Sequence, residues 1–146
     1  MNNGNELERN KDVVRRCIEE VWNGGRVELI AELVHGNFRG HHERNRDQDV
    51  YGIDSFRGWV ESVRAAAPDL RLRVGLMLAE ADRVMVHLEG SGIRVGEAES
   101  GPAAAQAVTF TATAVLRLAE GRIAESWMIY DALGVLQQLG VVAPLR

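Results

Sequence analysis

The chain has 146 residues, of which 46% are hydrophobic and 26% are charged, and its formal net charge is -4. This length suits one domain with a buried core, and the scattered arginines lack the basic patch typical of nucleic-acid-binding proteins. The single cysteine, Cys17, cannot form an internal disulfide, and no stretch approaches the roughly 20 apolar residues that span a bilayer. The N-terminus also lacks the apolar stretch of a secretion signal. We therefore expect a cytoplasmic protein with one domain over residues 1–146, which binds neither nucleic acid nor membrane.

Three helices are expected in the first half of the chain, after a disordered lead over residues 1–6. Apolar residues recur at helical spacing over about residues 10–22 and predict the first helix. A short second helix is expected over residues 27–33. A third is expected over about residues 52–66, and Pro68 prevents its continuation.

Strands dominate the second half, where the apolar period changes to two. The pattern predicts strands over residues 70–78, 84–88, 108–118 and 122–130, followed by a short helix over residues 132–139. A brief strand over residues 38–42 is also expected, between the second and third helices. Because helices and antiparallel strands are segregated along the chain, the order favours an α+β fold. A curved antiparallel sheet with the N-terminal helices across one face would enclose an apolar pocket suited to a small molecule.

A motif near the C-terminus is the most specific feature of the sequence. It consists of Gly121-Arg122-Ile123, Glu125-Ser126-Trp127, Asp131, and the Leu-x-x-Leu-x-Gln-Leu-Gly run from Leu133 to Gly140. This arrangement resembles the closing signature of the SnoaL-like polyketide cyclases, which belong to the nuclear transport factor-like superfamily. Upstream, Pro68-Asp69-Leu70 and Asp82-Arg83-Val84 are similar to shorter motifs of the same family.

The resemblance implies a cone-shaped, cystatin-like α+β barrel that forms a homodimer or a higher homo-oligomer. It also implies that the protein closes a ring in a hydrophobic polyketide intermediate of antibiotic biosynthesis, by an aldol reaction without metal or cofactor. The acid/base residue of the family corresponds to Asp131. Residues 98–105 depart from the family pattern, so pyran-forming or cycloaddition ring closure, a hydroxylase-type component of a tailoring pathway and a non-catalytic ligand-binding dimer module stay open.

Asp131 also fits acid/base chemistry on its own residue pattern. It follows Ile123, Trp127 and Ile129 at even spacing, and a regular strand places such residues on one face. Burial in an apolar pocket would raise the pKa of its carboxyl group toward the pH at which a general acid/base works best. The structural alternative is that Asp131 caps the N-terminus of the helix over residues 132–139.

The second acid/base candidate is His42, whose alternative is a surface position beside the charged loop that follows it. Several polar or aromatic residues are further candidates for substrate contact: Trp127, Tyr51, Trp59, Arg57, Thr111 and His87. For the tryptophans the alternative is core packing, for Arg57 a solvated helix position, and for His87 a half-exposed strand position. The spacing of the four histidines and of Cys17 predicts no metal site.

Overall fold

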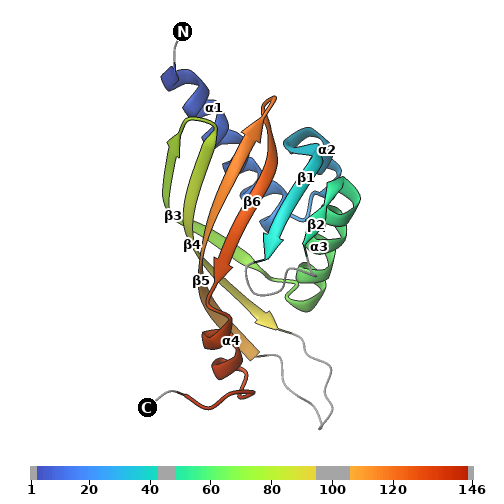
Figure 1. Cartoon of the computed structure of the whole chain (residues 1–146). Coiled ribbons are helices and arrows are strands. Elements are labelled where there is room, and N and C mark those ends of the chain that lie inside the picture. The colour runs from blue at the N-terminus through green and yellow to red at the C-terminus, as the bar shows by residue number, and fades with distance from the viewer. Residues whose placement is uncertain (1–2, 43–48, 95–105, 145–146) are drawn as a thin grey trace.

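The fold is a curved six-stranded sheet with helices packed across one face (Figure 1). The structure is a computed structural model that describes residues 3–42, 49–94 and 106–144. In this part the strand order is β2-β1-β6-β5-β4-β3; β1 and β6 pair in parallel and the other neighbours are antiparallel. The strands are β1 (Val34–His42), β2 (Val50–Tyr51), β3 (Arg71–Glu80), β4 (Arg83–Arg94), β5 (Gln106–Ala119) and β6 (Arg122–Tyr130). Because β2 and β3 do not pair with each other there, the described sheet is not a closed barrel.

The helices confirm the α+β class. Helix α1 (Asn3–Arg16) continues into a π-helical segment, η1 (Cys17–Asn23), and a short 3₁₀ turn, η2 (Val27–Leu29), leads into α2 (Ile30–Leu33). The remaining helices are α3 (Gly52–Ala66) and α4 (Ala132–Gln138). In the described part of the chain, no helix is long and apolar enough to cross a lipid bilayer.

Helix α1 is longer than the apolar pattern predicts. It begins at Asn3, so residues 3–6, which we expected to be disordered, are helical. The first turns are almost fully exposed and therefore carry no apolar periodicity. Ion pairs three residues apart, Glu8 with Lys11 and Asp12 with Arg15, support this exposed stretch.

Strand β4 extends further than expected, because glycines interrupt its apolar alternation. Gly90 and Gly92 have no side chains to continue the pattern, yet both pair regularly with β5. A Cβ atom at Gly90 would overlap the ring of Phe110, so only glycine leaves room for this ring to lie over position 90. Strand β1 also starts earlier than expected, at Val34, and the two-residue strand β2 was not predicted.

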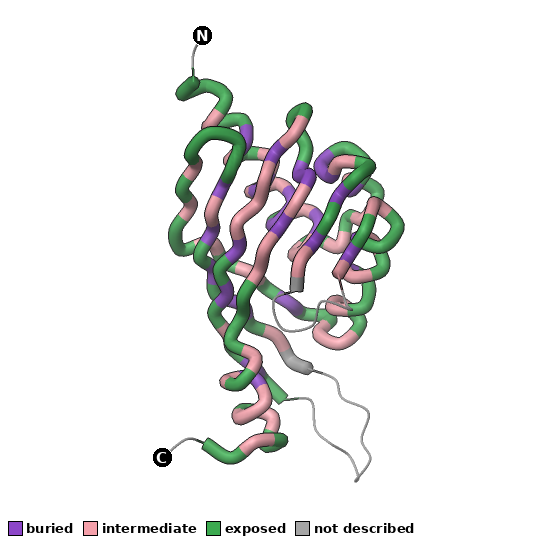
Figure 2. The backbone as a smooth tube through the Cα atoms, in the orientation of Figure 1, coloured by how far each residue is buried: buried purple, intermediate pink, exposed green. Residues whose placement is uncertain are grey.

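The core lies between the helices and the face of the sheet that they cover, here called the inner face (Figure 2). Helical residues such as Val14 and Val21 meet strand residues such as Val84 and Val86, all almost fully buried. Burying one such side chain contributes roughly 1.5–3 kcal/mol. Four aromatic rings pack edge-on beside them with centroids 4.7–5.9 Å apart: Trp22, Phe38, Phe56 and Trp59.

A β-bulge in β6 decides which residues face outward. Leu118 pairs with Ile123 while the adjacent Arg117 pairs with Glu125, so Ala124 is an extra residue on β6. Ile123 is buried on the inner face, whereas Trp127 is on the opposite, outer face. Our expectation that these two residues share one face is therefore wrong, because the bulge shifts the alternation by one residue.

Strand β5 runs past the end of β6, and helix α4 covers the free edge. Beyond the Ala112–Tyr130 pair, β5 has no β6 partner in the part of the chain that the structure describes. The side chain of Gln138 instead accepts a hydrogen bond from Thr109 N at 2.9 Å and donates one to Thr109 O at 2.7 Å. The backbone N–H of Asp131 donates to Thr111 O at 3.1 Å. These bonds fix the start of α4, and thus Asp131, against β5.

Candidate functional site

Asp131 lies at the junction between β6 and α4. Its Oδ1 accepts a hydrogen bond from Gly134 N at 2.9 Å, so the carboxylate caps the helix, as the structural alternative predicts. The residue is exposed rather than enclosed in the water-poor surroundings that we expected. In the described part of the chain, Oδ2 forms no hydrogen bond, so one carboxylate oxygen is available for another partner.

Asp131 lines a groove of about 530 Å³ at this end of the sheet. The strand residues of the groove include Arg71 and Arg73 of β3, Glu89 of β4, and Thr111 of β5. Arg73 pairs with Glu89 across the strands, whereas Arg71 forms no ion pair with any residue that the structure describes. Phe110 also lines the groove. The groove thus combines a carboxylate, a hydroxyl group and a guanidinium group that has no ion-pair partner among the described residues.

The groove differs from the apolar pocket expected between the helices and the sheet. Both this groove and another along α1 contain charged side chains. On the inner face, the space beside α3 is filled by the edge-on rings of Trp22, Phe56 and Trp59. Trp59, a candidate for substrate contact, is thus part of the aromatic core, although it keeps some exposure.

Three other predicted residues lie on the outer face of the sheet. The ring of Trp127 stacks on His41, with centroids 5.3 Å apart, and the guanidinium carbon of Arg83 lies 5.3 Å from the Trp127 ring centroid. Tyr51 is exposed and its ring lies beneath the guanidinium of Arg39. His87 is also exposed, and its Nδ1 lies 2.9 Å from the hydroxyl group of Thr113.

The remaining candidates are not close to Asp131 in the described contacts. Arg57 forms an ion pair with Asp54 one turn away on α3, at 2.9 Å. The backbone of His42 ends β1 opposite Met128, and its side chain lies outside the described part of the structure. Of the predicted residues, only Asp131 and Thr111 line the same groove.

Sequence reasoning missed a cluster around His41 on the outer face. His41 Nε2 lies 2.6 Å from Glu125 Oε2, and its Nδ1 lies 3.5 Å from Asp49 Oδ2. Glu125 also accepts a hydrogen bond from Arg117 Nε at 3.2 Å. The hydrogen bond with His41, and secondarily the one with Arg117, holds the pKa of the Glu125 carboxyl below its usual range. Strand alternation predicts that the side chains of His41 and His42 point apart. The contact between His41 and Glu125 could not be predicted, because the local sequence does not reveal that β1 pairs in parallel with β6.

Tyr130 and Arg71 were also missed. Tyr130 pairs with the buried Ala112 and therefore projects from the inner face, where its ring meets Phe110 edge-on at 6.1 Å. Its position next to Asp131 is a signal that could have drawn attention to it. Arg71 alternates with apolar residues of β3, and this pattern indicates only that its side chain points away from the core.

The sequence matches the SnoaL-like polyketide cyclase family over residues 12–139, and the chain belongs to that family. Among curated proteins, none matches the chain in sequence. Solved structures share the fold. The proposed SnoaL-like polyketide cyclase from Jannaschia sp. CCS1 is 25% identical with a TM-score of 0.80, and the alignment covers 95% of each chain.

Two structures from Streptomyces species are similar as well. AclR of Streptomyces galilaeus, described as a proposed hydroxylase, is 23% identical with a TM-score of 0.79; the alignment covers 96% of this chain and 86% of AclR. IdmH of Streptomyces antibioticus, described as a proposed polyketide cyclase, is 23% identical with a TM-score of 0.77 and coverage of 90% and 98%. At this identity, the likeness to AclR and IdmH establishes the fold alone.

Proposed function

We propose that the protein closes a ring in a hydrophobic polyketide intermediate, within the groove that Asp131 lines, and that it does so without a cofactor. Family membership supports the class of reaction. The observation that carries the assignment of the site is the geometry of Asp131. One oxygen of its carboxylate is fixed by the Gly134 N–H, while the other is left without a hydrogen bond in the described part of the chain. A fixed carboxylate with one free oxygen is suited to move a proton.

In the aldol form of this reaction, Asp131 Oδ2 removes a proton from the carbon next to a carbonyl group. The electrons of the broken C–H bond form an enolate, whose oxygen receives hydrogen bonds from the Arg71 guanidinium and the Thr111 hydroxyl. The enolate carbon then forms a C–C bond to a second carbonyl carbon, and the resulting alkoxide takes the proton back from Asp131. General acid/base catalysis contributes roughly 10²- to 10⁴-fold to the rate, and the fixed position of both chain ends contributes the rest.

Arg71 gives the groove its electrostatic role. Because its guanidinium has no carboxylate partner in the described structure, its charge is available to the negative oxygen that develops during the reaction. The neighbouring Arg73 is already paired with Glu89 and is a weaker source of positive charge. Pyran formation or cycloaddition would use the same groove with a different bond-forming step.

The second candidate function is a non-catalytic ligand-binding module. The helix cap favours it, because capping alone would explain the position of the Asp131 carboxylate. A hydroxylase-type role, as proposed for AclR, would require dioxygen and a reductant.

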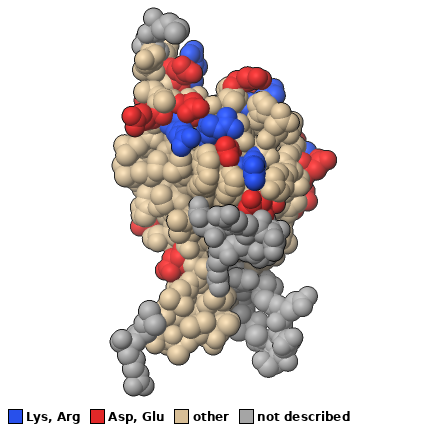
Figure 3. Space-filling model, in the orientation of Figure 1, with Lys and Arg blue, Asp and Glu red and all other residues tan. Residues whose placement is uncertain are grey.

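The exposed outer face supports self-association, the expected partner being a second copy. Two neighbouring rows of side chains cross the strands there, and their large apolar members include Leu76, Leu78 and Ile129, which are 48%, 53% and 65% exposed. Figure 3 shows this face with a broad area free of charged side chains beside a charged band. Such a surface buries its apolar area when two copies pack face to face.

The charges that flank these rows suit a twofold arrangement. On β3 and β4, the pair Glu80 and Arg83 lies on one side of the rows, and the pair Arg73 and Glu89 lies on the other. A twofold axis running across the strands would place Glu80 of one copy opposite Arg73 of the other, and Arg83 opposite Glu89. Both contacts join opposite charges, as an isologous interface requires.

The decisive experiment compares wild type with Asp131→Asn. Asparagine is as good a helix cap as aspartate, so the variant should keep its melting temperature while losing its carboxylate. With linear polyketide intermediates of a cytoplasmic biosynthetic pathway as substrates, we expect ring closure to fall by about 10²-fold or more. Asp82→Asn, at the exposed β3–β4 turn, is the matched control and should keep full activity.

Equal product formation by wild type and Asp131→Asn would remove Asp131 from the mechanism. A tight ligand complex without turnover in either protein would favour the binding module. Turnover that depends on added reductant and dioxygen would favour the hydroxylase role.

A further inference from the structure

Helix α1 contains a buried polar side chain that has no hydrogen-bond partner among the described residues. Asn10 is only 6% exposed and lies on the same helix face as Val14 and Cys17, four and seven positions further on. An apolar residue would be the ordinary choice at this position. Throughout the described part of the chain, the amide group of Asn10 forms no hydrogen bond. Leaving such a group unpaired costs about 1–3 kcal/mol, so a partner outside the protein is expected.

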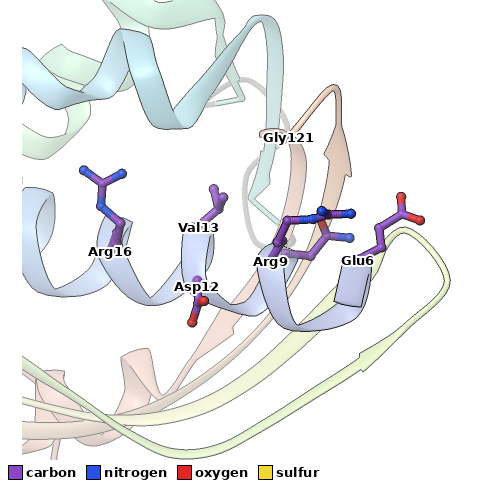
Figure 4. A pocket seen from close by; sticks show the side chains of 7 residues that line it. Glu6, Arg9, Asp12, Val13, Arg16 and Gly121 are labelled. Atoms are coloured by element: carbon purple, nitrogen blue, oxygen red, sulfur yellow. The ribbon is translucent and has the colours of Figure 1, made fainter. Parts of the chain in front are cut away.

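Asn10 lines another groove, which has a volume of about 430 Å³. Figure 4 labels the other residues that line this groove. The groove runs along α1 beside the β5–β6 turn, and it is lined by Glu6, Arg9, Asn10, Asp12, Val13, Arg16 and Gly121. Because Gly121 precedes β6 and Asp131 follows it, the two grooves lie at opposite ends of this strand. The groove is therefore distinct from the proposed site of ring closure.

Among the described residues, the ion pairs of the groove leave one cation available. Asp12 is paired with Arg15, and Arg16 is paired with both Glu20 and Glu32. Within residues 3–42, 49–94 and 106–144, Arg9 forms no ion pair. Its guanidinium and the amide of Asn10 together supply several N–H donors, which match the two acceptor oxygens of a carboxylate.

The shape of the groove indicates the rest of the ligand. Gly121 has φ +73°, and a Cβ atom built on it would meet no atom within 4 Å, so the space beside the turn is open. Val13 provides an apolar wall. Glu6 forms no ion pair with any described residue, and its negative charge disfavours a dianion such as phosphate more than a monoanion.

We propose that this groove is a binding site for a small organic monocarboxylate. Arg9 and Asn10 hold its carboxylate oxygens, and its hydrocarbon part lies against Val13 and the open side of Gly121. The site goes beyond the ring-closing activity and does not depend on it. Its occupation also satisfies the buried amide of Asn10, which accounts for a polar residue at this position of the helix.

The test uses sodium benzoate as the probe and benzamide as its uncharged match, titrated into ¹⁵N-labelled full-length protein. We expect saturable NMR shifts at the side-chain NH₂ of Asn10 and the backbone amide of Gly121 with benzoate only. Arg9→Gln should weaken benzoate binding about tenfold, the range for a charge-assisted hydrogen bond. The control Arg73→Gln, in the other groove, should bind benzoate as wild type does.

Asn10→Leu provides an independent readout. In the absence of benzoate it should raise the melting temperature, because it removes an unpaired buried amide, and it should abolish the benzoate shift at Gly121. The proposal is overturned by the absence of a saturable benzoate shift in wild type, by an equal response to benzamide, or by unchanged affinity in Arg9→Gln. If Asn10→Leu does not fold, the comparison of Arg9→Gln with Arg73→Gln still decides.

Discussion

The carboxylate of Asp131 lies so close to the Cα atom of Gly134 that a Cβ atom at position 134 would overlap Asp131 Oδ2. Glycine inside a helix usually costs roughly 0.5–1 kcal/mol relative to alanine. At position 134 glycine is needed nevertheless, because a side chain there would occupy the space of the Asp131 carboxylate. Gly134 therefore determines where the acid lies at the start of α4.

Gly134→Ala should consequently destabilise the protein and reduce ring closure, although alanine is the better helix former. We expect the melting temperature to fall, measured by circular dichroism, and product formation to fall with it. Gln137→Ala, in the same helix, is the control and should change neither quantity appreciably. A higher melting temperature with full activity in Gly134→Ala would show that the carboxylate can move without consequence.

Arg71→Gln should lower kcat by about 10- to 100-fold with a smaller effect on KM, because the guanidinium acts on the charge that develops in the transition state. Steady-state kinetics with a linear intermediate measures both constants. Arg73→Gln removes the same charge from a group that is already paired with Glu89 and should cost less. Equal losses in the two variants would contradict a specific role for Arg71.

Glu125 links stability to pH. Its pKa is lowered in the folded protein, so it stabilises the fold above the ordinary carboxyl pKa, and this stabilisation is lost as the pH falls through the lowered value. Glu125→Gln should therefore cost about 1 kcal/mol at pH 7, and less as the pH falls through the lowered pKa. Urea unfolding across this range measures the difference.

The control for Glu125→Gln is Glu89→Gln, which removes a carboxylate from an exposed ion pair with Arg73. Exposed pairs contribute about 0–1 kcal/mol, so this variant should show little change with pH. A Glu125→Gln penalty that stays the same size as the pH falls from 7 through the lowered pKa would count against the His41–Glu125 bond as its source.

Self-association through the outer face predicts that Leu78→Glu combined with Ile129→Glu yields a monomer. A charge placed in each apolar row would be buried at the interface without a partner. Light scattering coupled to size-exclusion chromatography measures the mass. Leu133→Glu, a similarly exposed leucine on α4, is the matched control and should keep the mass of wild type.

Burial raises the pKa of the Cys17 thiol to about 12, so the native protein contains very little thiolate at pH 8. Iodoacetamide should therefore leave native Cys17 unmodified while it fully modifies a denatured sample, as followed by mass spectrometry. Because Cys17 is the single cysteine, the mass change reports this site alone. Rapid modification of the native protein would show that η1 opens readily.

The apolar periods of the sequence were sufficient to predict the fold class and strands β3 to β6. They failed where a residue carries no side chain or is inserted. Gly90 and Gly92 hid the full length of β4, and Ala124 reversed the alternation that had placed Ile123 beside Trp127. Both failures concern single residues whose effect appears only once the neighbouring strand is paired.

The site was less predictable than the fold. The C-terminal motif led to Asp131, and the capping pattern led to the hydrogen bond with Gly134. The exposure of Asp131 was not predicted, because it depends on how far β5 extends beyond the end of β6. Likewise, the contact of His41 with Glu125 depends on a parallel register between segments 84 residues apart.

The two hydrogen bonds between the Gln138 side chain and the backbone N–H and C=O of Thr109 have a consequence for the behaviour of the protein at high concentration. A strand without a neighbour offers its N–H and C=O groups to strands of other molecules and so promotes aggregation. Here one side-chain amide imitates the peptide group of the missing strand, occupying the donor and the acceptor together. The glutamine thereby keeps that stretch of β5 from serving as a template for fibril growth.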